Sequence, residues 1–269
     1  MCSSDLQAGM GLAIGDVNHD GFPDLFVTNL DGETNAMYVS EGGSLFNEAA
    51  MKWGLGERSL PFTGFGTALV DLDHDGEEEV LVVNGRVTRR KSDREQVASF
   101  WSQYAERNHL YHRDGQRFSF VTSSQDPFLS EAGVSRSLCV GDIDNDGDLD
   151  ALVVNIAGLA RLYENIAEKR GHFLNVRVVE PTMGSRDAYG AKVTVEAGGK
   201  RWVHHVAPGA SYLSSNDPRL HFGLGEVSAI DRLEVRWPDG SSETFSVKQV
   251  DQFVVLEHGK GERIAEVAP

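Results

Sequence analysis

The chain has 269 residues, of which 40% are apolar, and its formal net charge is −16. No apolar run approaches the ~20 residues that span a bilayer, and binding to nucleic acid or to an anionic lipid surface depends on Lys and Arg. We therefore expect neither membrane insertion nor a nucleic-acid partner. The 29 glycines and the strand-type residues of the apolar runs favour an all-β architecture with many turns.

The N-terminus lacks the basic and apolar segments of a signal peptide. Residues 2–6 are what the end of a common sequencing-adapter oligonucleotide gives when it is translated in one frame. We therefore expect residues 1 to about 6 to be foreign and the true upstream chain to be missing. The two cysteines, Cys2 and Cys139, are too few for a disulfide framework and do not decide the compartment.

Three segments repeat one pattern, in which a short apolar strand enters an acidic turn and a second apolar strand leaves it. They are residues 11–29, 66–84 and 137–155, and each continues into further strand-like pieces. A unit of roughly 50 residues with four short strands is typical of a propeller blade. We expect residues 7–170 to form three blades of a β-propeller, which is partial because propellers close with ~4–8 blades.

The acidic turns share the spacing Asp-x-Asp/Asn-x-Asp-Gly-x-x-Asp/Glu, and we name them the first loop (residues 16–24), the second loop (71–79) and the third loop (142–150). Alternate side chains of a tight turn can point inward together, and the glycine permits the sharp bend. Hard oxygen ligands on a flexible loop suit Ca²⁺ better than Zn²⁺ or Mg²⁺. The sequence therefore predicts about three Ca²⁺ ions. The predicted side-chain ligands are Asp16, Asn18, Asp20, Asp24, Asp71, Asp73, Asp75, Glu79, Asp142, Asp144, Asp146 and Asp150. Backbone carbonyl ligands are expected from Phe22, Glu77 and Asp148.

An EF-hand shares the first six positions of this spacing but requires a Glu at loop position 12 and flanking helices. Position 12 is Val27, Val82 or Val153, each inside a β-branched run, which excludes an EF-hand. The repeats instead resemble FG-GAP/VCBS repeats, known from integrin α-subunit propellers and many secreted bacterial proteins. In that family the loop binds Ca²⁺ and ties neighbouring strands of a blade. Asn18 is neutral and should leave the first site with less charge.

The second repeat carries an insertion, residues 86–107. It opens with a basic run, and Ser92 and Glu95 then have the spacing of a helix capping box. Val97, Phe100, Trp101 and Tyr104 follow at helical spacing and predict an amphipathic helix. The helix either packs on its own blade or serves as a partner-binding or lid element.

Residues 171–260 lose the acidic loops and show alternating strand patterns, so we expect a small β-rich C-terminal domain. This stretch resembles the ASPIC/UnbV domain, which follows FG-GAP repeats in known proteins. The matching motifs are residues 185–193, 209–215, 220–225 and 235–240. With the repeats, nearly the whole chain after the first few residues is thus similar to bacterial relatives of the acidic secreted cartilage proteins, which implies an extracellular or periplasmic location.

No nucleophile motif, phosphate-binding glycine loop or zinc spacing occurs in the sequence. His204 and His205 are adjacent, so in a strand they face opposite sides and cannot chelate one metal. We therefore expect no enzyme but a calcium-binding scaffold for binding or adhesion, with a protein or glycan partner. The alternative is the non-catalytic part of a secreted hydrolase or lyase whose active site lies upstream.

Overall fold

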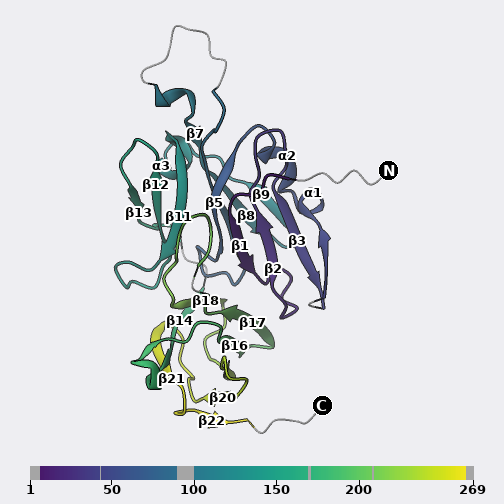
Figure 1. The fold of residues 1–269 in the computed structure, drawn as a ribbon. Coiled ribbons are helices and arrows are strands. Elements are labelled where there is room, and N and C mark those ends of the chain that lie inside the picture. Colours follow the sequence, from purple (N-terminus) through teal and green to yellow (C-terminus); the bar gives the residue numbers. More distant parts are fainter. Residues whose placement is uncertain (1–6, 43, 90–99, 169–170, 208, 265–269) are drawn as a thin grey trace.

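Strands dominate the structure, as the sequence predicts for an all-β protein (Figure 1). The computed structural model describes residues 7–42, 44–89, 100–168, 171–207 and 209–264. The helices of this part of the chain are short, and none of them has the length and apolar character needed to cross a membrane. They are α1 (Ala50–Trp53), α2 (Gly56–Ser59), α3 (Pro127–Ser130) and the 3₁₀ turns η1 (Trp101–Gln103) and η2 (Pro181–Met183).

Each repeat folds into its own antiparallel sheet, with strand orders β1-β2-β3-β4, β5-β6-β8-β9 and β11-β12-β13. The two strands that flank each acidic loop are paired neighbours, so every loop closes a hairpin at the end of its sheet. The strands are β1 (Leu12–Gly15), β2 (Asp24–Val27), β3 (Ala36–Glu41), β4 (Leu45–Glu48), β5 (Gly64–Val70), β6 (Glu79–Asn84), β8 (His109–Asp114), β9 (Arg117–Phe120), β11 (Ser135–Gly141), β12 (Asp150–Asn155) and β13 (Arg161–Tyr163).

The second sheet lies between the other two and is covered on both faces. Every residue of β5 and β6 is buried, which explains why these strands are continuous apolar runs instead of alternating ones. One face packs against Phe26 and Met37 of the first sheet, and the other packs against Leu138 and Val153 of the third. The three hairpins are therefore held side by side, with their loops at the same end of the stack (Figure 1).

A short two-stranded ladder joins the insertion to the segment that precedes the third repeat. It pairs β7 (Glu106–Arg107) with β10 (Ala132–Gly133). The predicted helix of the insertion falls largely outside the described residues, which resume at Phe100. Within them only the single turn η1 is helical, and the rings of Phe100, Trp101 and Tyr104 pack on one another.

Residues 171–264, which we call the C-terminal region, form two further sheets around one apolar core. In β14 the residues Leu174, Val176 and Val178 are fully buried, and they meet Val193 and Val195 of β16 in that core. One sheet has the order β15-β14-β18 with β21 parallel to β14, and the other has the order β17-β16-β19-β20-β22. The strands are β14 (His172–Glu180), β15 (Arg186–Asp187), β16 (Lys192–Ala197), β17 (Lys200–His205), β18 (Leu220–Gly225), β19 (Arg232–Arg236), β20 (Ser242–Phe245), β21 (Gln252–Glu257) and β22 (Glu262–Arg263).

The count of sheets differs from the three blades that the repeats predict. The described residues hold five blade-like sheets of three or more strands. The sequence count was too low because only three of the five sheets carry the acidic loop that served to recognise a blade. Figure 1 shows the C-terminal region packed against the ends of the repeat sheets where the loops lie.

Candidate metal centre

The three acidic loops adopt one backbone conformation, although they lie in different sheets. In each, the sixth residue is a glycine with positive φ, as the spacing predicts: Gly21 (85°), Gly76 (90°) and Gly147 (105°). The fourth residue also has positive φ in each loop: His19 (56°), His74 (65°) and Asn145 (63°). Sequence reasoning missed this second position. The signal was available, because Asn, Asp and His are enriched among non-glycine residues in the left-handed region.

The first acid of each loop accepts a hydrogen bond from the backbone of its glycine. One carboxylate oxygen of Asp16, Asp71 or Asp142 takes the N–H of residue i+5 at 2.9, 2.7 or 3.0 Å respectively. These bonds fold the loop back over the carboxylate. The first acid is therefore held by the same backbone contact in all three loops.

The ninth residue of each loop closes the hairpin from the other strand. Its carboxylate accepts the N–H of the second loop residue, at 2.9 Å in the first loop, 3.0 Å in the second and 3.1 Å in the third. The three acids are Asp24, Glu79 and Asp150, all buried. Each also reaches the next strand or segment of its sheet: Asp24 accepts from Ser40 N, Glu79 accepts from Arg113 N, and Asp150 accepts from Asn165 N.

In the second loop the predicted ligands converge. Asp71, Asp73 and Glu79 are all buried and offer carboxylate oxygens within 4.8 Å of one another. Burial raises the pKa of Asp71 to about 7 and that of Glu79 to about 9, and the neighbouring loop carboxylates push both further in the same direction. The raised pKa values mean that the ionised carboxylates are poorly compensated in this site. A bound cation would supply the positive charge that stabilises them.

A histidine that sequence reasoning did not select borders the second loop. Asp73, Asp75 and His112 form another group whose ligand atoms lie within 4.8 Å of one another. His112 stands on β8 and its Nδ1 lies 3.0 Å from Oε1 of Glu79. No local spacing signalled this residue, because it reaches the loop only through the pairing of β6 with β8.

In the third loop Asp142, Asp144 and Asp146 converge in the same way. Asp144 and Asp146 are exposed, whereas Asp142 is buried and its Oδ1 atom has no hydrogen-bond partner in the part of the chain that the structure describes. Burial raises the pKa of Asp142. An orphaned carboxylate oxygen beside two exposed carboxylates is an arrangement that fits a hard divalent cation.

The first loop brings fewer charges together. Asn18 and Asp20 are exposed, and the Asn18 amide donates to Oδ2 of Asp20 at 3.0 Å. Burial raises the pKa of Asp16, and that of Asp24 to about 6. Within the described residues, no three of its acids meet the 4.8 Å criterion that the other two loops satisfy.

The residues expected to offer backbone carbonyls sit at the seventh position of each loop. Their N–H groups donate to the fifth-position carboxylate at 2.8 Å for Phe22, 2.9 Å for Glu77 and 3.0 Å for Asp148. The side chain of Glu77 pairs with His19 and Arg113, and that of Asp148 pairs with His74. Metal coordination by the three carbonyls stays a prediction.

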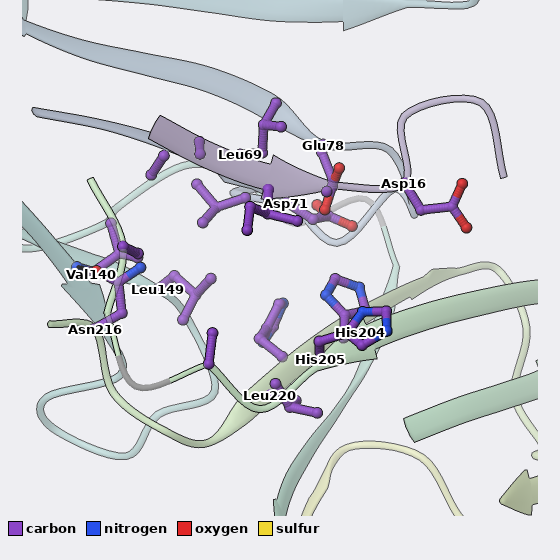
Figure 2. A pocket seen from close by; sticks show the side chains of 18 of the residues that line it. Asp16, Leu69, Asp71, Glu78, Val140, Leu149, His204, His205, Asn216 and Leu220 are labelled. Atoms are coloured by element: carbon purple, nitrogen blue, oxygen red, sulfur yellow. Dashed lines mark hydrogen bonds between the residues drawn. The ribbon is translucent and has the colours of Figure 1, made fainter. Parts of the chain in front are cut away.

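A cavity of about 400 Å³ is lined by residues of both the repeats and the C-terminal region. Figure 2 shows Asp71 and Glu78 on its repeat side, opposite His204 and His205 of β17. Leu69 and Val140 add apolar walls from the innermost strands of the second and third sheets. Residues of the acidic loops and of the C-terminal region therefore line the same cavity.

Comparison with known proteins agrees with this architecture. Residues 9–82 and 97–153 match the model of the FG-GAP-like repeat, and residues 181–263 match that of the ASPIC and UnbV family. Cartilage acidic protein 1 of Xenopus tropicalis is 26% identical over 300 aligned positions, which cover 93% of this chain and 44% of the relative. The proteins of the same name from Mus musculus and Homo sapiens are each 25% identical over 302 positions, covering 94% of this chain and 45% and 44% of the relatives. The chain spans less than half the length of these curated relatives.

Proposed function

Because the chain belongs to the family that joins FG-GAP-like repeats to an ASPIC and UnbV domain, and is homologous to cartilage acidic protein 1, we propose that it is a calcium-binding, extracytoplasmic repeat protein without catalytic activity. The observation that carries the proposal is the matched geometry of the loops. The same backbone turn occurs three times, and in two of the loops it gathers three carboxylates within 4.8 Å.

The donor set favours Ca²⁺ over other metals. Ca²⁺ takes about six to eight oxygen ligands in a flexible geometry, which suits the carboxylates of these turns. Zn²⁺ prefers His and Cys ligands, and Mg²⁺ keeps much of its hydration water. A bound cation would supply the positive charge that these buried acids lack. The chain's own contribution is to fix the oxygens through the backbone bonds to residues such as Asp71 and Asp142.

The role that follows for the cation is structural. Each loop closes the hairpin of one repeat sheet, and its ninth residue also bonds the following strand or segment. A cation that neutralises the loop carboxylates would therefore stabilise the pairing of the strands within a sheet. Ca²⁺-binding modules that work outside the cell have dissociation constants of ~10⁻⁴–10⁻³ M, a range that fits partly exposed loops and the proposed extracellular or periplasmic location.

The proposed scaffold presents its surfaces to a protein or glycan partner. The second candidate is the non-catalytic part of a secreted hydrolase or lyase. It is supported by the length comparison, since the relatives have more than twice as many residues as the part aligned here. A longer gene sequence that encodes a catalytic domain would favour this second candidate.

Isothermal titration calorimetry with Ca²⁺, and with Mg²⁺ as the control ion, tests the proposal. We expect about three Ca²⁺ per chain and much weaker binding of Mg²⁺. Absence of Ca²⁺ binding at millimolar concentration would refute the function proposed for the loops.

A further inference from the structure

The C-terminal region packs directly on the second loop. Gly225 N donates to His74 O at 2.8 Å, and the Trp202 indole Nε1 donates to Gly76 O at 3.2 Å. These two carbonyls belong to the two positive-φ residues of the loop. The contacts therefore hold the positions on which the shape of the loop depends.

The same region also holds the third loop. Asn175 Nδ2 donates to Asp142 Oδ2 at 3.2 Å, and the Arg219 guanidinium donates to Asp142 O and to Asn145 Oδ1 at 2.5 and 2.6 Å. Asn175 is itself oriented, because its Oδ1 lies 2.8 Å from Nδ1 of His221. Asn175 of β14 and Arg219, which lies immediately before β18, thus reach the first acid of the loop and its fourth residue.

Close packing reinforces the polar contacts. A Cβ atom at Gly147 would lie 2.3 Å from the Phe173 ring, so any larger residue there would force the ring to move. The same ring lies 5.3 Å from that of His74, whose Nε2 lies 3.3 Å from Oδ1 of Asp148 in the third loop. The second and third loops therefore form one surface, and the C-terminal region covers it.

The first loop provides a comparison within the molecule. It meets the C-terminal region through Arg201, whose guanidinium lies against Gly21: a Cβ there would be 2.5 Å from Nη1. Its third and fifth residues, Asn18 and Asp20, stay exposed.

We propose that the C-terminal region supplies the positioning residues of the second and third cation sites, chiefly Trp202 and Asn175, so that cation binding and the docking of this region are one coupled equilibrium. The inference rests on the proposed calcium binding. A loop whose carbonyls and first acid are held in place loses less conformational freedom when it binds a cation. By linkage, the cation must then strengthen docking by the same factor.

Hydrogen exchange measures the docking side of this coupling. The amides of Gly225 and Asp217 donate across the boundary, to His74 O and Val140 O, and report on contact between the two parts. With a chelator in place of Ca²⁺ we expect exchange at both amides to rise by on the order of tenfold, a typical size for coupling between two sites. The amides of β16, paired inside the C-terminal region, serve as the control and should change little.

Two tryptophan variants measure the binding side. Trp202→Phe removes the indole donor and keeps a ring in place. Trp237→Phe is the matched control, because Trp237 is equally buried in the same region and its Nε1 has no hydrogen-bond partner among the described residues. The loss of one neutral hydrogen bond is worth a factor of ~2–10, so Trp202→Phe should weaken Ca²⁺ binding at the second loop by that factor.

The titration is made in a background with Asp20→Ala and Asp144→Ala, which confines Ca²⁺ binding to the second loop. Asn175→Ala, measured with Asp20→Ala and Asp73→Ala, gives the corresponding test at the third loop. Circular dichroism verifies the fold of each variant. If a variant does not fold, the exchange experiment on the unaltered chain still tests the coupling.

The outcomes separate this inference from the proposed function. If the unaltered chain binds no Ca²⁺, both are wrong. If it binds Ca²⁺ but exchange at Gly225 and Asp217 does not respond and the two tryptophan variants bind equally, the coupling is wrong and the calcium function stands. Slower exchange with Ca²⁺, together with weaker binding by Trp202→Phe alone, supports the coupling.

Discussion

The first and second loops share a spacing and a backbone conformation but differ in their surroundings. In the second loop Asp71, Asp73 and Glu79 are buried, and the C-terminal region packs on the loop. In the first loop the third and fifth positions face solvent, and the third is the neutral Asn18. Since solvent screens exposed charges and burial strengthens their interaction, the same motif should bind a cation with different affinity in the two places.

Removing Ca²⁺ should have the largest effect, because it acts on all the loops together. A site held at a hundredfold excess over its dissociation constant contributes ~2.7 kcal/mol to the free energy of unfolding. With a shift of ~2–4 °C per kcal/mol for chains of this size, a chelator should lower the melting temperature by on the order of 10 °C or more. Thermal melts with Ca²⁺ and with the chelator check this, and equal midpoints would contradict a structural role.

Asp73→Asn gives the second loop the third-position residue of the first loop. It removes one carboxylate charge from a buried site, so Ca²⁺ binding at this loop should weaken by ~10–100-fold even after relief of repulsion with Asp71 and Asp75. Calorimetric titration measures the change. With chelator present the variant should be at least as stable as the unaltered chain, because a buried charge is gone. An unchanged affinity would show that burial does not strengthen this site.

Asp144→Ala tests an exposed member of a converged cluster. The variant should lose about one bound ion and ~2–3 kcal/mol of the Ca²⁺-dependent part of the free energy of unfolding, since Asp142, Asp146 and Asp150 then lack one of the four side-chain ligands of the loop. Asn18→Ala is the matched control at the same loop position and should have a smaller effect, because a neutral ligand adds less Coulomb attraction. Unchanged ion stoichiometry would remove Asp144 from the ligand set.

Asn18→Asp should have the smallest effect and the opposite sign. It gives the first loop the charge pattern of the second, but at an exposed position where screening is strong, so binding should tighten only ~2–5-fold. The measurement is the same titration at low and at physiological salt. If the gain equals the loss caused by Asp73→Asn, sequence alone sets affinity and the environment does not.

Much of the secondary structure and of the loop conformation could be predicted from local sequence. The apolar runs before and after each acidic turn predicted paired strands, and the glycines at positions 21, 76 and 147 predicted positive φ. The alternating patterns after residue 171 predicted the strands that form the two sheets of the C-terminal region. These features depend on near neighbours in the chain, so periodicity and turn chemistry suffice to find them.

The surroundings of the loops were decided by contacts between distant residues. His112 reaches the second loop through strand pairing, Trp202 reaches Gly76 from 126 positions away, and Asn175 reaches Asp142 from another sheet. The number of sheets also came from packing and not from the repeat. The sequence by itself determined which turns carry the acids, because a turn is a local structure. Only the tertiary structure decided which acids are buried together and what covers them, because burial depends on residues that no local spacing connects.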